Sequence, residues 1–118
     1  IYTINMKKIN GEVLSTHPFP GSEFIQDIIY YDAPILSLYK FEGRLFLWYW
    51  MDTNEIMNRW SVIETTMDKL QTWKEKDYVW EFVEECILNN EVYFINLDTE
   101  KKFVVGWKCG VDELVNYD

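Results

Sequence analysis

The chain has 118 residues, of which 11 are basic and 20 acidic, so its formal net charge at pH 7 is -9. This charge disfavours direct binding to DNA or RNA, because nucleic-acid affinity rests largely on lysine and arginine contacts to phosphates. The length predicts a single domain over residues 1–118, and an aromatic content of 18% supplies large side chains for its core. No stretch reaches the ~20 apolar residues of a membrane-spanning helix, so no membrane association is predicted.

The first predicted elements are short. Residues 1–9 alternate weakly between apolar and polar side chains, which favours a strand, and Asn10-Gly11 is a typical two-residue hairpin turn. Val13-Leu14 is then expected to be the returning strand. Residues 15–22 contain two prolines and a glycine, which predict a loop. Residues 24–31 fit either a helix or a strand, and the turn signal that follows them favours a strand.

The centre of the chain predicts three consecutive antiparallel strands. Residues 44–51 carry one charge and are rich in aromatic side chains, so we expect a strand that is covered on both faces. Residues 35–41 precede this strand across the turn Glu42-Gly43, and residues 57–64 return after a polar turn. Short turns between successive strands predict an antiparallel meander.

The middle strand of this meander has two faces of different character. Side chains alternate along a strand, so Trp48 and Trp50 share one face and Leu47 and Tyr49 share the other. One face needs helices to cover it. The other is a candidate for the floor of an aromatic groove.

Two short helices are predicted after the meander. Thr65-Thr66-Met67-Asp68 has the form of a capping box and begins a helix that runs through Trp73. The second helix follows the capping candidate Asp77 and ends at Asn89-Asn90. Its apolar residues form one continuous stripe, made of Val79, Phe82, Val83, Cys86 and Ile87.

The remaining residues complete the predicted fold. Residues 91–97 and 102–108 are expected to form a closing hairpin, and residues 111–117 a frayed helix. The predicted fold class is α+β, an antiparallel β-meander sheet with two short helices between strands that pack on one face.

The chain contains no recognisable catalytic, metal-binding or cofactor-binding motif. His17 is the only histidine, and no partner that would orient it as a general base can be assigned. Cys86 and Cys109 do not have the spacing of a CxxC motif, and we expect both to be reduced thiols of a cytoplasmic protein. The sequence therefore predicts a protein that is not an enzyme and holds no cofactor or metal.

One exposed surface is a candidate for binding a protein partner. Trp80 lies off the apolar stripe of the second helix, next to Tyr78, and exposed tryptophan and tyrosine are typical of interface hot spots. Glu81, Glu84 and Glu85 lie on the polar side of the same helix and would suit a partner with a basic surface. The alternative is that a neighbouring loop covers Trp80 and that the three glutamates form an ordinary solvated face.

Four segments together resemble a family of small bacterial proteins that is catalogued only as a domain of unknown function. They are a "YYDxP" turn at residues 30–34, a "GxLYLxxWxD"-like strand at 43–52, an "RWL"-like strand at 59–63 and a "VYxVDLD"-like strand at 91–98. Ala33 stands where this family would be expected to have glycine. The resemblance implies the meander, the helices and the closing strand, and it implies no activity.

Two functional hypotheses follow from these features. The first is a non-enzymatic acidic protein-interaction domain, either an accessory subunit or a regulator or inhibitor of a bacterial or phage protein. Small size, acidic charge and the lack of a catalytic motif favour it. The alternative is a domain that senses a small molecule or nucleotide with its aromatic groove.

Overall fold

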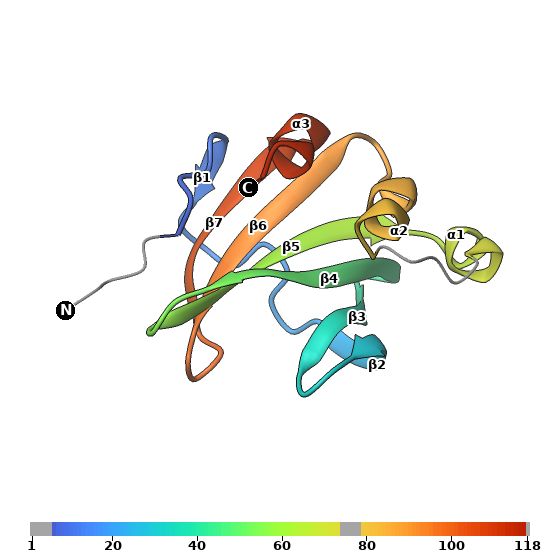
Figure 1. Ribbon diagram of the computed structural model, residues 1–118, viewed down its shortest axis with the longest axis horizontal. Helices are drawn as coiled ribbons and strands as arrows, with labels where there is room; N and C mark the ends of the chain where they lie inside the picture. The colour runs from blue at the N-terminus through green and yellow to red at the C-terminus, as the bar shows by residue number, and fades with distance from the viewer. Residues whose placement is uncertain (1–5, 74–78, 118) are drawn as a thin grey trace.

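A computed structural model describes residues 6–73 and 79–117 of the chain (Figure 1). In these residues the chain forms seven strands and three short helices. In chain order they are β1 (Glu12–Leu14), β2 (Glu23–Tyr30), β3 (Pro34–Phe41), β4 (Arg44–Thr53), β5 (Met57–Thr65), α1 (Met67–Thr72), α2 (Val79–Cys86), β6 (Glu91–Asp98), β7 (Phe103–Gly110) and α3 (Val111–Val115). None of the helices in the described ranges is long and apolar enough to cross a membrane.

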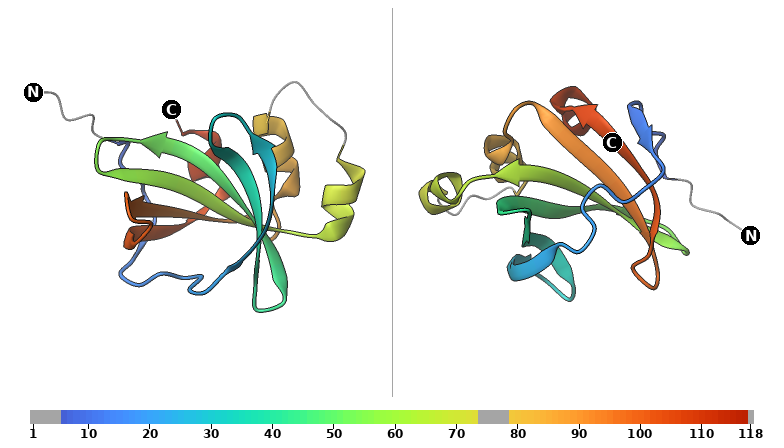
Figure 2. Two further views of the ribbon diagram at one scale, coloured as in Figure 1. Left: turned by 90° about the horizontal axis from the view of Figure 1, so that it is seen from below. Right: turned by 180° about the vertical axis from the view of Figure 1, so that it is seen from behind.

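All seven strands belong to one antiparallel sheet in the order β1-β7-β6-β5-β4-β3-β2. From β2 to β7 the strands follow one another as in a meander, which confirms the predicted α+β class with an antiparallel sheet. The sheet is strongly twisted, and the β2–β3 and β6–β7 hairpins lie toward its opposite ends (Figures 1 and 2). Of the ambiguous segment at residues 24–31, all but Tyr31 lies in strand β2.

Local turn chemistry explains why the strands pair as they do. Glu42 and Gly43 both have positive φ, 50° and 76°, which is the backbone conformation of a tight turn between antiparallel strands. Asn89 and Asn90 also have positive φ, 56° and 55°, and they lead from α2 into β6. Asparagine tolerates this left-handed region better than most residues. α2 ends at Cys86, three residues before the end predicted at Asn89-Asn90, and these two residues form the turn into β6.

The predicted hairpin at the N-terminus is wrong where the structure describes it. Residues 6–10 form no strand, and β1 pairs with β7 at the other end of the chain. A Cβ atom at position 11 would collide with Cys109 Sγ and would lie 2.8 Å from the carbonyl oxygen of Lys108. Gly11 therefore permits a close approach of the backbone to β7 and is not part of a hairpin turn.

The helices begin close to the predicted positions. Thr66 caps α1, because its side-chain oxygen accepts a hydrogen bond from the backbone N–H of Lys69 at 3.2 Å. The residue three positions after this cap is Lys69 and not an acid, so the predicted capping box is not formed. The cap predicted at Asp77 lies outside the described residues.

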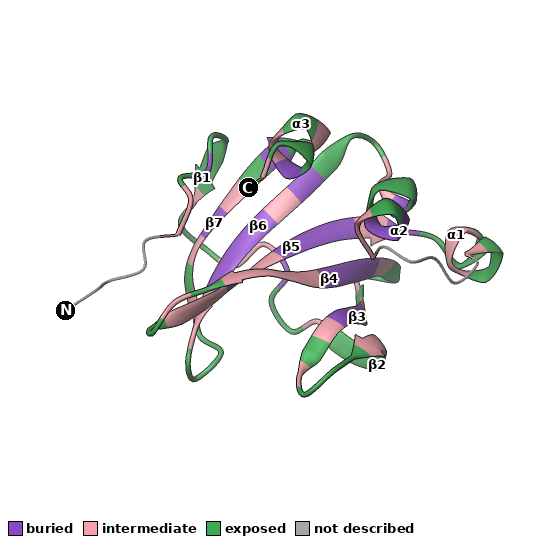
Figure 3. Ribbon diagram, viewed as in Figure 1, coloured by how far each residue is buried: buried purple, intermediate pink, exposed green. Residues whose placement is uncertain are grey.

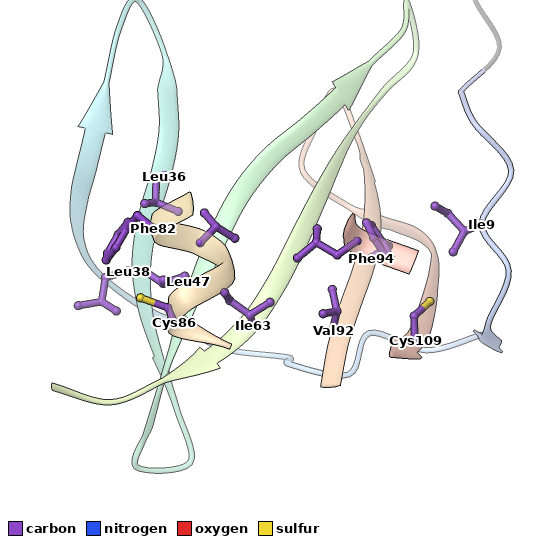
Figure 4. Close-up of a cluster of buried hydrophobic side chains, with 12 residues drawn as sticks. Ile9, Leu36, Leu38, Leu47, Ile63, Phe82, Cys86, Val92, Phe94 and Cys109 are labelled. Atoms are coloured by element: carbon purple, nitrogen blue, oxygen red, sulfur yellow. The ribbon is translucent and has the colours of Figure 1, made fainter. Parts of the chain in front are cut away.

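Two buried clusters form the core. The larger joins Phe82, Val83 and Cys86 of α2 and Leu114 of α3 to strand residues such as Leu47, and we call it the helix-strand cluster. Figure 4 shows Phe82 and Cys86 beside Leu47 and Ile63. The second, which we call the aromatic cluster, consists of Phe19, Phe46, Trp48, Val62 and Ile95. Buried stretches run along β4, β5 and β6 (Figure 3). In β4 the buried residues are Phe46, Leu47 and Trp48, so the predicted cover on both faces is found over these three residues and not over the whole of residues 44–51.

Candidate functional site

A groove of about 470 Å³ lies on the Trp48 side of the sheet. Four aromatic side chains from four successive strands line it, and we call it the aromatic groove: Phe24 of β2, Tyr39 of β3, Trp48 of β4 and Trp60 of β5. Residues opposite each other in neighbouring strands point to the same face, as do residues two positions apart in one strand. Phe24 is opposite Tyr39, and Trp48 is opposite Ser37 and Val62. Ser37 is two positions from Tyr39 and Val62 is two positions from Trp60, so all four rings lie on one face. A groove is therefore present on the Trp48 face of β4, although Trp50, which was predicted to share this face, is not among its lining residues.

The rings of the groove contact one another in sequence. Ring centroids are 5.5 Å apart for Phe24 and Tyr39, 5.1 Å for Tyr39 and Trp48, and 6.3 Å for Trp48 and Trp60. The interplanar angles of 72°, 44° and 61° turn each ring against its neighbour. Such edge-to-face and tilted pairs are favourable, so the walls support each other without a ligand.

Polar groups are placed among these rings. Asp27 accepts a hydrogen bond from the hydroxyl of Ser37 at 2.7 Å, which fixes its carboxylate at the groove. Burial, and next the charge of Asp27, raise the pKa of the Tyr39 hydroxyl. The Oδ1 atom of Asn58 accepts a hydrogen bond from Trp50 Nε1 at 3.1 Å. The indole N–H of Trp48 is buried and has no acceptor in the described part of the chain.

The loop over residues 15–22 covers part of the same face. Phe19 is buried, with ring centroids 4.7 Å from Phe46 and 4.8 Å from Tyr93. The ring of His17 lies 6.0 Å from Trp48, and its Nδ1 accepts a hydrogen bond from the backbone N–H of Phe19 at 2.9 Å. His17 thus holds the loop against the sheet as a neutral ring, because an atom that accepts this bond cannot carry a proton.

We expect the free energy of unfolding to fall as the pH is lowered through the titration of His17. Burial lowers the pKa of His17 below its ordinary value of 6.5, so the unfolded chain takes up the proton first. The stabilisation that neutral His17 contributes is complete above pH 6.5 and is lost as the pH falls through the pKa of His17 in the folded protein. Urea unfolding of the wild type and of His17→Asn, which keeps an acceptor but does not titrate, measures the effect as a difference. Equal pH dependence of the two proteins would contradict the assignment.

The predicted partner-binding residues are only partly brought together. Glu81, Glu84 and Glu85 are exposed on one side of α2. Trp80 is half-buried, and its ring centroid lies 6.1 Å from that of Tyr49 of β4, so the sheet covers it in part. Tyr78 lies outside the described residues. A role of these five residues in partner binding stays a prediction.

The two cysteines lie in surroundings that keep their thiols protonated. Cys86 and Cys109 are free and buried, and burial raises the thiol pKa of both, that of Cys109 to about 11. A raised pKa keeps a thiol protonated and unreactive. Across residues 6–73 and 79–117, no group of three His, Cys, Asp or Glu side chains is arranged to hold a metal ion.

Sequence reasoning missed the polar residues of the groove. Asp27, Ser37 and Asn58 carry no motif, and each becomes part of the groove only through its strand register. One signal was available. Asn58 is two positions before Trp60, so it shares a face with that ring.

The described residues define an α+β domain whose twisted antiparallel sheet carries an aromatic groove on one face. No protein-family model, no curated protein and no solved structure matches the chain. The resemblance to the small bacterial family stays a prediction that rests on the four segments that carry it.

Proposed function

We propose that this protein is a non-enzymatic binding domain that holds a small planar organic cation in the aromatic groove. The observation that carries the proposal is the placement of the Asp27 carboxylate at a groove walled by Tyr39, Trp48 and Trp60. Aromatic faces attract cations through their quadrupole, and a desolvated contact of this kind is worth about 2 kcal/mol. The groove volume of about 470 Å³ falls in the range of ligand sites, roughly 300–1,000 Å³.

The charges around the groove favour a cation over a nucleotide. Asp27 and Asp98 line the groove, and Lys101 is the only cation among its described lining residues. The net charge of -9 adds a negative field over the whole molecule. A phosphate group would meet two carboxylates here, so an amine suits the groove better than a phosphate.

We infer that both predicted helices pack against the face opposite the groove. This is supported by Phe82 and Val83 of α2, which are buried with Leu47, and by Leu70 of α1, which is partly buried against the same cluster. Leu47 and Trp48 point to opposite faces of β4, so helices on the Leu47 side do not obstruct the groove.

Thermal unfolding with tryptamine and tryptophol tests the proposal. Both contain an indole ring, and tryptamine carries an ammonium group where tryptophol carries a hydroxyl. At a hundred times its Kd, tryptamine should stabilise the fold by about 2.7 kcal/mol, which for a chain of this length raises Tm by roughly 10 °C. Tryptophol should bind about tenfold more weakly, because it lacks the charge that Asp27 attracts.

Two matched substitutions locate the binding. Asp27→Asn keeps an oxygen for the Ser37 hydroxyl but removes the charge, and it should abolish the preference for tryptamine over tryptophol. Asp32→Asn makes the same change in net charge at an exposed turn that does not line the groove, and it should bind like the wild type. The proposal fails if tryptamine gives no shift in Tm, or if Asp27→Asn and Asp32→Asn weaken tryptamine binding equally.

A protein-interaction domain is a second candidate function. It is favoured by the exposure of Glu81 and Glu84 on one side of α2, which could face a basic partner surface. Affinity capture from a bacterial host with the wild type and with Glu81→Lys/Glu84→Lys would distinguish the two functions, because the groove lies on strands β2 to β5 and is left intact by these changes.

A further inference from the structure

A second hollow, of about 680 Å³, lies on the other face of β5. We call it the Arg59 pocket, after the residue at its wall. Asn58 and Trp60 line the aromatic groove, so the intervening Arg59 points to the opposite face. The apolar part of the pocket comes from the N-terminal segment, strand β1, the start of β5 and strand β7. It includes Ile9, Val13, Met57, Val105 and Trp107.

Arg59 is buried and firmly oriented. It is 3% exposed. Its Nε donates a hydrogen bond to Asn96 Oδ1 at 2.8 Å, and its Nη1 donates to the carbonyl oxygen of Lys7 at 2.6 Å and to the Tyr117 hydroxyl at 3.0 Å. The guanidinium carbon also lies 5.0 Å from the centroid of the Trp107 ring. These contacts leave the side chain little freedom to move.

The charge of Arg59 is not matched by a carboxylate in contact with it. Within the part of the chain that the structure describes, no Asp or Glu lies within ion-pair distance of the guanidinium. The closest compensation passes through a hydroxyl, since Tyr117 donates a hydrogen bond to Asp52 Oδ2 at 2.7 Å. Nη2 has no acceptor among the described residues, although an arginine has five N–H donors to satisfy.

Other charged residues at the pocket add to its excess of positive charge. Lys7 and Lys8 line it together with Arg59, and Glu55 is its only acidic lining residue. Glu55 is exposed. Three cations around one hollow are unexpected in a protein with a net charge of -9. Buried charges are normally paired, so this pocket has the electrostatics of a site for an anion.

We propose that the Arg59 pocket binds an organic carboxylate with an apolar body, the carboxylate on Arg59 and the body against Ile9, Met57 and Trp107. The Nε–H and both Nη1–H groups already donate to Asn96, Lys7 and Tyr117, so the two N–H groups of Nη2 remain to donate to a carboxylate, and such charge-assisted bonds are among the stronger hydrogen bonds in proteins. Burial of the apolar body against these side chains supplies a favourable term of about 25 cal/mol per Å². The proposal is independent of the aromatic groove, which has other residues, another face and a ligand of opposite charge.

Titration with decanoate and decanamide tests the charge requirement. The two molecules have the same alkyl chain, so a site that selects the carboxylate must bind decanoate more tightly. We expect a difference of at least about tenfold, because hydrogen bonds between charged groups are roughly twice as strong as neutral ones. Calorimetry gives the affinities, and nitrogen-proton NMR of the Arg59 Nε–H and Asn96 side-chain amide reports whether decanoate reaches the pocket.

A matched pair of surface substitutions locates the binding without disturbing the core. Val13 is 66% exposed and lines the pocket, so Val13→Glu and Val13→Gln should both fold. Val13→Glu places a negative charge at the site and should weaken decanoate binding by at least about tenfold, whereas the neutral Val13→Gln should change it little. Arg59→Met, where it folds, should abolish the preference for decanoate over decanamide.

The proposal is overturned if decanoate and decanamide bind equally, if decanoate leaves the Arg59 resonance unmoved, or if Val13→Glu and Val13→Gln bind it with the same affinity. Asp27→Asn separates this result from the groove, because that substitution should alter tryptamine binding and leave decanoate binding unchanged.

Discussion

Phe19→Ala is expected to lower the free energy of unfolding by about 3–5 kcal/mol, the range for truncating a buried phenylalanine. Phe19 comes from the loop over residues 15–22 and not from the sheet, yet it is 5% exposed and packs on three rings, those of Phe41, Phe46 and Tyr93. Its removal leaves a cavity over β4 and β6. The loop then loses its main apolar contact with the sheet.

The same substitution should also alter the aromatic groove. The backbone N–H of Phe19 donates to His17, and the His17 ring packs beside Trp48. A loop released at Phe19 therefore exposes Trp48 to water. We expect a red shift of tryptophan fluorescence and a weaker effect of tryptamine on Tm.

Phe24→Ala is the matched control for Phe19→Ala. Phe24 is also a phenylalanine on the groove side of the sheet, but it is 51% exposed and contacts Tyr39 at the edge. Its truncation should cost less than about 1 kcal/mol, because little area is lost from the core. Urea unfolding measures both variants. Equal losses would show that Phe19 does not anchor the loop.

Local signals were sufficient to predict most of the strands. The apolar run at residues 44–51 and the turn at Glu42-Gly43 define the first hairpin of the meander, and the structure shows that hairpin in full register. The stripe over residues 79–87 likewise predicted the buried side of α2. In each case neighbouring residues decide the structure, so a short window of sequence contains the information.

The N-terminal error has a different cause. Asn10-Gly11 is a strong hairpin signal only when a strand on each side is free to pair, and here β1 pairs with β7, about a hundred residues later. The edge of β7 offers unpaired backbone groups to whichever segment reaches it. Gly11 fits that edge closely. A contact over this separation leaves no local pattern, so the sequence predicts a turn at Gly11 where the structure has a close backbone contact with β7.

In the candidate sites too, features set by neighbouring residues were predictable and features set by distant contacts were not. The rings of the aromatic groove were predictable in part, because alternation in one strand separates Trp48 from Leu47. The polar groups were not, since Asp27 and Asn58 line the same groove only when four strands are in register. Arg59 is the extreme case. Its partners Lys7, Asn96 and Tyr117 lie 52, 37 and 58 residues away, and nothing near Arg59 in the sequence shows that it is buried.

Phe82→Ala is expected to have a comparably large effect on the opposite face of the sheet. Phe82 is 1% exposed in the helix-strand cluster, and its ring centroid lies 4.2 Å from that of Trp73. An isolated helix of this length is unstable in water, so α2 depends on its packing. Loss of the ring should cost about 3–5 kcal/mol. It should also unfold α2 locally while the sheet persists.

Hydrogen exchange distinguishes local from global destabilisation. In Phe82→Ala, amide protection should fall first over residues 79–86, and strands β4 and β5 should remain protected below the unfolding midpoint. Glu84→Ala is the control, because Glu84 is exposed on the same helix and alanine is a strong helix former, so stability should change by no more than about 0.5 kcal/mol. If Phe82→Ala leaves the exchange of α2 unchanged, the helix is not held by this ring, and the inference that α2 packs against the face opposite the groove fails with it.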